Sequence, residues 1–102
     1  MIRHLVLWKL AADADQDKQL IIAELEERFA PLADLDGVER LEIRADIGET
    51  DGNWDVVLDG DYRDTAALDA YQVHPAHVEV VGYVRSVVTA RACIDFEVSS
   101  PA

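Results

Sequence analysis

The order of hydrophobic and polar residues predicts β-strands in four stretches: residues 2–10, 38–47, 54–62 and 89–98. Residues 38–47 follow a regular two-residue repeat, because Leu41 and Ile43 alternate with charged residues. That pattern predicts a strand with one face in the core and one face in solvent. Residues 2–10 carry apolar side chains on both faces, which predicts a strand covered on both sides.

Helical patterns separate these strands. Ile21, Leu25 and Phe29 recur at intervals of four residues, which predicts a helix with one apolar face. Asp13 and Asp15 precede it as predicted caps, and Gly37 follows it as a stop signal.

A second helical region is interrupted at a proline. Residues 64–73 predict a short helix capped by Asp64 or Thr65, and Pro75 suits the first turn of another helix over 75–88. The valines of this last segment would also suit a strand, so propensity alone leaves its conformation open.

The order of elements predicts an α+β fold. Strand, helix, strand, strand, helix pair and strand is the ferredoxin-like βαββαβ order, a four-stranded antiparallel sheet with helices on one face. The Asp51-Gly52 pair predicts a hairpin turn, and Gly60 a bulge. We expect one domain over residues 1–98 and a flexible tail over 99–102.

Helices on one face leave the other face of the sheet bare, although residues 2–10 are apolar on both faces. The pattern therefore predicts that the bare face packs on a second copy of the chain, as a symmetric homodimer.

Charge narrows the set of partners. The chain has 102 residues, 21 acidic against 9 basic, and a net charge of -12. This charge opposes binding to nucleic acid and to anionic membranes. No signal peptide and no apolar run of ~20 residues is expected, so we predict a soluble cytoplasmic protein. The single cysteine, Cys93, excludes an intrachain disulfide and is predicted to be a small buried residue.

Three segments resemble the stress-responsive dimeric α/β barrel (Dabb) family: "MIRHLVLWKL", "YQVHPAHVEVV" and "ACIDFEV". The resemblance implies that two protomers form a dimeric barrel with their sheets face to face. One branch, similar to plant polyketide cyclases, closes a linear poly-β-ketone by intramolecular aldol condensation without metal or organic cofactor. That likeness implies His77 as the base, Tyr71 as its assistant and His4 as a pocket residue.

Physical chemistry agrees with a base at His77. If Pro75 is the first helical residue, His77 lies in the first turn, where the helix dipole and partial burial both favour a neutral imidazole. Tyr71 can then stabilise a developing enolate, and His4 can orient substrate or carry a second proton. The structural alternatives are that Tyr71 and His4 are core residues and that His74 closes a helix. His74, His77 and Glu79 offer a weak metal set, and we predict no metal.

The predicted pocket lies between the sheet and the helices. Its substrate-binding residues are predicted to be Val6, Trp8, Ile22, Glu26, Leu58, Val81 and Arg91. Glu26 stands where the cyclase-like branch has an aromatic residue, and Arg91 and Cys93 replace aliphatic ones. Glu26 and Arg91 would pair if they face one cavity. The substrate should therefore differ from that of the cyclases.

These observations predict a protein that binds a small hydrophobic or carbonyl-containing molecule without a cofactor. The alternative is a cofactor-independent enzyme of the polyketide cyclase type with His77 as general base. A second alternative is a related barrel monooxygenase that acts on quinol-like aromatics.

Overall fold

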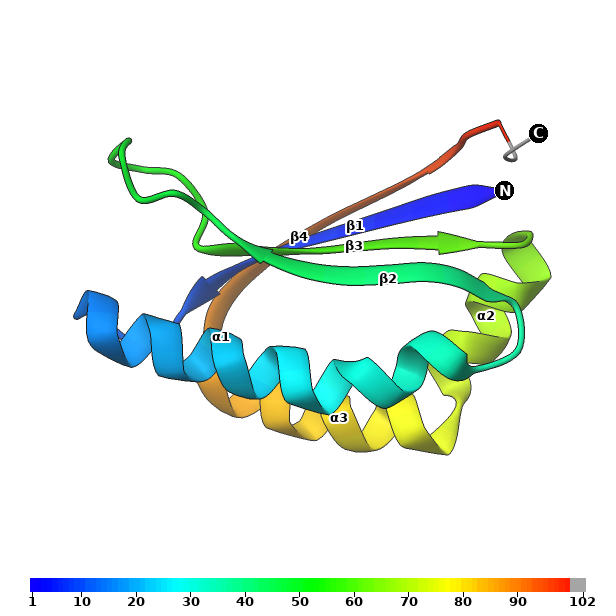
Figure 1. Ribbon diagram of the computed structural model, residues 1–102, viewed down its shortest axis with the longest axis horizontal. Coiled ribbons are helices and arrows are strands. Elements are labelled where there is room, and N and C mark those ends of the chain that lie inside the picture. The colour runs from blue at the N-terminus through cyan, green and yellow to red at the C-terminus, as the bar shows by residue number, and fades with distance from the viewer. Residues whose placement is uncertain (100–102) are drawn as a thin grey trace.

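The computed structural model describes residues 1–99, so residues 100–102 of the predicted tail lie outside the described residues. Its elements follow the predicted βαββαβ order, with a short 3-10 helix η1 after the first helix (Figure 1). Their bounds are β1 Ile2–Leu10, α1 Asp15–Phe29, η1 Ala30–Asp34, β2 Val38–Ala45, β3 Val56–Tyr62, α2 Thr65–Val73, α3 Pro75–Val87 and β4 Val88–Glu97.

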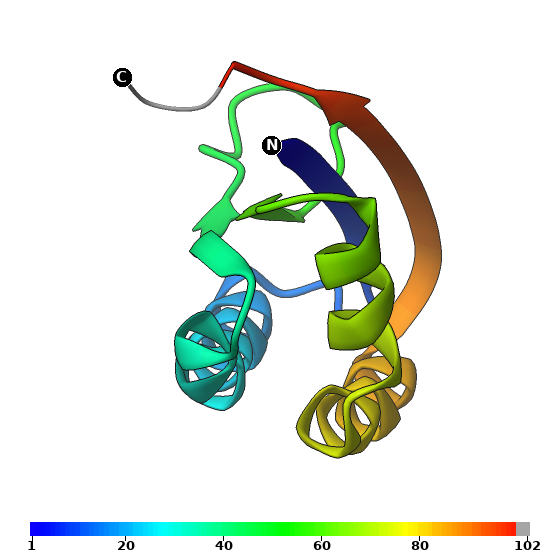
Figure 2. The ribbon, with the colours of Figure 1, turned by 90° about the vertical axis from the view of Figure 1, so that its right-hand side faces the viewer.

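The four strands form one antiparallel sheet in the order β2-β3-β1-β4. All the helices lie on the same side of this sheet (Figure 1). Viewed along the strands, β4 curves from beside α3 up and across to the far side of the molecule (Figure 2). The ferredoxin-like protomer predicted from the sequence is therefore confirmed.

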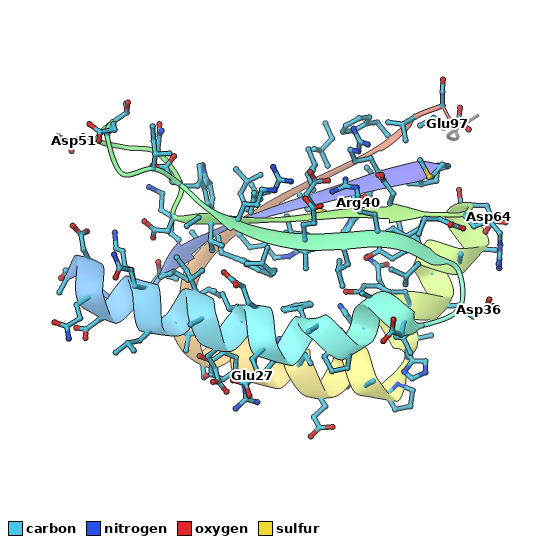
Figure 3. The ribbon with its side chains drawn as sticks, viewed as in Figure 1. Glu27, Asp36, Arg40, Asp51, Asp64 and Glu97 are labelled. Atoms are coloured by element: carbon cyan, nitrogen blue, oxygen red, sulfur yellow. The ribbon has the colours of Figure 1, made fainter. Side chains whose placement is uncertain are left out.

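The two faces of β1 are buried to different extents in the protomer. His4, Val6, Trp8 and Leu10 are buried against the helices, whereas Leu5 and Leu7 are only half-buried on the opposite face. Their neighbours on that open face include Ile94 and Phe96 of β4, which are 58% and 40% exposed. Arg40 of β2 also points away from the helices (Figure 3). The open face thus combines apolar residues on β1 and β4 with charged residues on β2 and β3.

Two strands are shorter than predicted because the β2–β3 connection is long. β2 ends at Ala45, β3 begins at Val56, and Ile47 between them is 84% exposed. The Asp46 carboxylate accepts hydrogen bonds from the main-chain N–H of Gly48 and the side chain of Asn53, which holds the loop together. Ile47 therefore lies outside the strand despite its apolar side chain.

The glycine predicted to mark a bulge serves close packing instead. The register of the β2–β3 pair shifts between Val38 and Arg40, whereas Gly60 itself stays in register opposite Leu41. A Cβ atom on Gly60 would lie 3.0 Å from Tyr62 and 3.1 Å from Leu41. Position 60 therefore favours glycine, because the side chains of Tyr62 and Leu41 pack closely over its backbone.

Helix boundaries follow the sequence signals in part. The Asp64 carboxylate accepts from the main-chain N–H of Ala67 at 2.8 Å, which confirms it as the cap of α2. The cap of α1 is Ala14, without a side-chain hydrogen bond, so the caps predicted at Asp13 and Asp15 are wrong. Asp15 instead lies in the first turn, where the helix dipole favours its charge.

The segment that propensity left open is helical. α3 runs over Pro75–Val87 despite its valines, because Val80 and Val84 fall on one face and are buried in the core. Within residues 1–99, no helix combines the length and the apolar character needed to span a membrane.

Candidate functional site

A cavity of about 530 Å³ lies between the sheet and α3. Eight residues of the predicted site line it: His4, Val6, Trp8, Leu58, Tyr71, His77, Val81 and Arg91. Sequence reasoning missed seven others: Phe29, Gln72, Val78, Gly82, Val84, Arg85 and Val88. Three of them could have been predicted from helical spacing. Val78, Gly82 and Arg85 fall on the same face of a helix as the predicted residues His77 and Val81.

Strand β1 brings His4 to one end of this cavity. Its side chain is buried, and Nδ1 contacts the Asp95 carboxylate closely and lies 3.5 Å from the Cys93 sulfur. A carboxylate accepts hydrogen bonds, so Nδ1 of His4 is the donor in this contact. Asp95 was missed from the sequence, although the β1–β4 register pairs it directly with His4.

Helix α2 places Tyr71 beside His77. The two ring centroids are 4.5 Å apart, and Tyr71 is 2% exposed. Burial raises the pKa of Tyr71 to about 12, although the neighbouring Tyr62 hydroxyl acts in the opposite direction, so the Tyr71 hydroxyl is protonated at neutral pH. Within the described residues this hydroxyl has no hydrogen-bond partner, and neither does that of Tyr62, whose ring lies 4.9 Å from the ring of Tyr71.

His77 lies in the first turn of α3, as predicted from Pro75. Its Nδ1 lies 3.0 Å from the main-chain carbonyl oxygen of Gln72. Partial burial lowers the pKa of His77 below the ordinary 6.5, and the nearby His4 lowers it further, while the bond to Gln72 opposes both. The imidazole is therefore neutral at pH 7, with Nδ1 as donor and Nε2 available as a base.

The first histidine of the pair has a different task. Nδ1 of His74 accepts the main-chain N–H of Ala76 at 3.0 Å, so His74 caps α3. It is exposed and does not line the cavity. The hypothesis that His74 is the structural member of the pair is consistent with this bond.

Two predicted pocket residues lie elsewhere. Ile22 packs in the main core, and Glu26 borders a separate groove together with Glu42 and Arg44. Glu26 and Arg91 therefore do not face one cavity, and the pair predicted between them does not form. The apolar face of α1 determines the position of Glu26. Because Leu25 and Phe29 are buried in the core, the Glu26 side chain lies toward β2.

The possible metal ligands also lie differently from the predicted set. In residues 1–99, one group of three ligand-bearing side chains converges, and it consists of His4, Cys93 and Asp95 rather than His74, His77 and Glu79. Cys93 is exposed in the protomer, so its predicted burial is wrong. The desolvation it does experience raises the pKa of its thiol and Asp95 raises it further, while the nearby Arg91 lowers it, and the net rise favours the thiol form at neutral pH.

The family model of the Stress responsive A/B Barrel Domain, Dabb, matches residues 2–98. The chain belongs to the Dabb family. The resemblance of its three quoted segments to that family is thereby confirmed over nearly the whole sequence. No curated protein matches the chain.

Solved structures share the Dabb fold at low identity. A dimeric ferredoxin-like protein of unknown function from Bacteroides fragilis is 23% identical, with 95% of each chain covered and a TM-score of 0.81. A Dabb protein with a ferredoxin-like fold from Mesorhizobium loti is 23% identical, with 97% of each chain covered and a TM-score of 0.76. A protein from Arabidopsis thaliana is 20% identical over 100% of this chain and 99% of its own, with a TM-score of 0.78. Identities this low establish the fold alone.

Proposed function

We propose that this Dabb protein binds a small carbonyl-containing molecule in the cavity between its sheet and α3. The observation that carries the proposal is a pair of buried donors without partners. The hydroxyl of Tyr71 and Nε1 of Trp8 both belong to cavity-lining side chains, and neither has a hydrogen-bond partner within the described residues. Leaving a buried polar group unpaired costs about 1–3 kcal/mol. Ligand oxygens that accept from these donors would remove that cost.

The walls of the cavity support an apolar ligand body. Valines of α3 face Val6 and Leu58 of the sheet across the cavity. Its volume of about 530 Å³ falls in the range of small-molecule sites. The oriented polar groups within an apolar wall are the usual composition of such a site.

A second candidate function is cofactor-independent proton abstraction, as in the cyclase-like branch. The observation that favours it is the contact of His77 Nδ1 with Gln72, which leaves Nε2 of a neutral imidazole as a base. Nε2 would take a proton from the carbon next to a carbonyl, and the electron pair would move to the carbonyl oxygen as an enolate. Tyr71 would donate a hydrogen bond to that oxygen.

The same histidine would complete the aldol addition with which such a condensation begins. The enolate carbon would attack a second carbonyl of the same molecule, forming a carbon–carbon bond and an alkoxide. The protonated His77 would return its proton to this alkoxide, so no external acid or oxidant is required. The barrel oxygenase alternative has no comparable observation in its favour.

We also propose that the chain forms a homodimer through the open face of its sheet. The exposed Ile94 and Phe96 and the half-buried Leu5 and Leu7 form an apolar area there. Arg3, Arg40 and Asp61 form an ion-paired cluster beside it, which leaves few charges unpaired at a contact. Two similar folds are described as dimeric ferredoxin-like proteins, from Bacteroides fragilis and Thermobifida fusca, and this supports the proposal.

One pair of variants separates binding from catalysis. His77→Gln removes the base, whereas His74→Asn keeps a good capping residue and changes a histidine outside the cavity. The probe is 4-phenylbutan-2-one, a ketone whose α-protons exchange slowly with deuterium at neutral pH. Binding is measured by tryptophan fluorescence, and proton abstraction by the loss of α-proton signals in D₂O.

The enzyme candidate predicts exchange that the protein accelerates, that His77→Gln abolishes and that His74→Asn retains. Binding without accelerated exchange would leave the binding proposal and reject the enzyme candidate. If the ketone does not bind to the wild-type chain, the proposed function is wrong for simple ketones.

A further inference from the structure

The charged side chains around the cavity are of one sign. Arg85 of α3 and Arg91 of β4 line it, and none of its lining residues is an Asp or a Glu. The chain as a whole has 21 acidic residues against 9 basic ones, so an acid-free lining with two guanidinium groups departs from its composition. This local charge favours an anion inside a protein that otherwise repels anions.

These two arginines also differ from the others in the chain. The remaining arginines each lie within 4.0 Å of a carboxylate, at positions 3, 28, 40, 44 and 63. Within residues 1–99, neither Arg85 nor Arg91 forms such an ion pair. Both are exposed side chains at the rim of the cavity, so their charges are available to a ligand.

The backbone positions of Arg85 and Arg91 lie toward the opposite end of the cavity from those of His77 and His4, and the Arg91 side chain also reaches the Cys93 thiol. On α3, His77, Val81 and Arg85 follow each other at intervals of four residues and all line the cavity. Eight residues of helix span about 12 Å. On β1, His4 pairs with Asp95, whereas Trp8 pairs with Arg91, and these four residues of strand span about 13 Å. The two elements therefore give a similar separation of about 12 Å between the backbone positions at the two ends.

We propose that the cavity holds an elongated keto acid, with its carbonyl among His4, Tyr71 and His77 and its carboxylate between Arg85 and Arg91. This inference rests on the proposed binding function and adds the class of ligand and its orientation. The valines between the two ends contact the hydrocarbon body. Trp8 lies near the carboxylate end, where its buried Nε1–H supplies a further donor.

The test compares four compounds by isothermal titration calorimetry on the full chain. They are 10-oxoundecanoate, its methyl ester, undecanoate and 4-oxopentanoate. The first has both recognition groups, the ester lacks the charge, undecanoate lacks the ketone, and 4-oxopentanoate is too short to reach both ends. The keto acid should bind about tenfold or more tightly than each of the other three.

Charge variants assign the effect to the two arginines. Arg85→Gln and Arg91→Gln should each weaken binding of 10-oxoundecanoate about tenfold and leave binding of its methyl ester unchanged. Arg63→Gln is the matched control, because Arg63 is an exposed arginine outside the cavity. It removes the same net charge and should change neither affinity.

The outcomes separate this inference from the proposed function. Equal binding of the acid and its ester would overturn the anionic end while leaving the binding function intact. Equal binding of the keto acid and undecanoate would overturn the carbonyl end. If neither ketone of this length binds, the proposed function fails together with this inference.

Discussion

Nδ1 of His77 lies 3.0 Å from the main-chain carbonyl oxygen of Gln72, the residue after Tyr71 in α2. A carbonyl oxygen only accepts hydrogen bonds, so this contact fixes the neutral imidazole with its proton on Nδ1. The helix break at His74 allows this contact. It places the first turn of α3, which contains His77, next to the last turn of α2, which contains Gln72. The same break places the His77 ring against Tyr71.

The tautomer and the pKa of His77 can be measured directly. We expect nitrogen NMR to show a protonated Nδ1 and a free Nε2 at pH 7, with a titration midpoint below the ordinary 6.5. The His77→Gln variant assigns the signals by their loss. A midpoint above 6.5, or a proton on Nε2 in the neutral form, would contradict the structure.

This lowered pKa also sets a direction for stability against pH. The unfolded chain binds a proton near the ordinary pKa of 6.5, before folded His77 does. The contribution of neutral His77 to the free energy of unfolding is therefore present above about pH 6.5 and is lost as the pH falls below it. His77→Gln should reduce this decrease in urea unfolding between pH 7 and pH 5. An unchanged pH dependence in the variant would contradict the burial of His77.

Tyr71→Phe should separate function from stability. The Tyr71 hydroxyl is buried without a partner within the described residues, so removing it should leave the free energy of unfolding unchanged or raise it by up to about 3 kcal/mol. Affinity for 4-phenylbutan-2-one should nevertheless fall about tenfold, because the ligand oxygen loses its donor.

Tyr62→Phe is the matched control for this substitution. Its hydroxyl is also buried without a partner in residues 1–99, but Tyr62 does not line the cavity. Urea unfolding and fluorescence titration of both variants check the prediction. Equal loss of affinity in the two would show that packing, rather than the Tyr71 hydroxyl, determines binding.

Gly37→Ala should destabilise the fold by about 2 kcal/mol or more. Gly37 has a φ of 82°, and a Cβ atom there would lie 2.6 Å from the Cβ of Ala67 in α2. Gly48 has a φ of 80° with nothing within 4 Å of the added Cβ, so Gly48→Ala carries only the backbone cost of about 1 kcal/mol. Thermal unfolding of the pair checks this difference, and equal losses would contradict the close approach of Ala67.

Phe96→Asp should convert the proposed homodimer to a monomer. Phe96 is 40% exposed on the open face of the sheet, and a buried carboxylate at an apolar contact is strongly unfavourable. Leu20→Asp is the control, because Leu20 is 64% exposed on α1, away from that face. Light scattering should give a dimer for the wild type and for Leu20→Asp, and a monomer for Phe96→Asp. A monomeric wild type at micromolar concentration would contradict the dimer.

The sequence by itself determined the fold and one half of the site. The two-residue period of β1 established which side chains share a face of the strand, because this period is a local property. The same holds for the His74-Pro75 break, since the restrictions that proline imposes act on neighbouring residues. His77 in a first helical turn, with Tyr71 just before the break, follows from these local rules.

Only the tertiary structure decided which distant residues meet. His4 and Asp95 are separated by 91 positions, and it is the β1–β4 register that joins them. The rotation of α1 about its axis sends Glu26 to another groove, and the packing of α3 brings Arg85 to the same cavity as Arg91. A local pattern gives the face on which a side chain lies, whereas register and helix packing are set by the whole core, and these determine the charge at each end of the cavity.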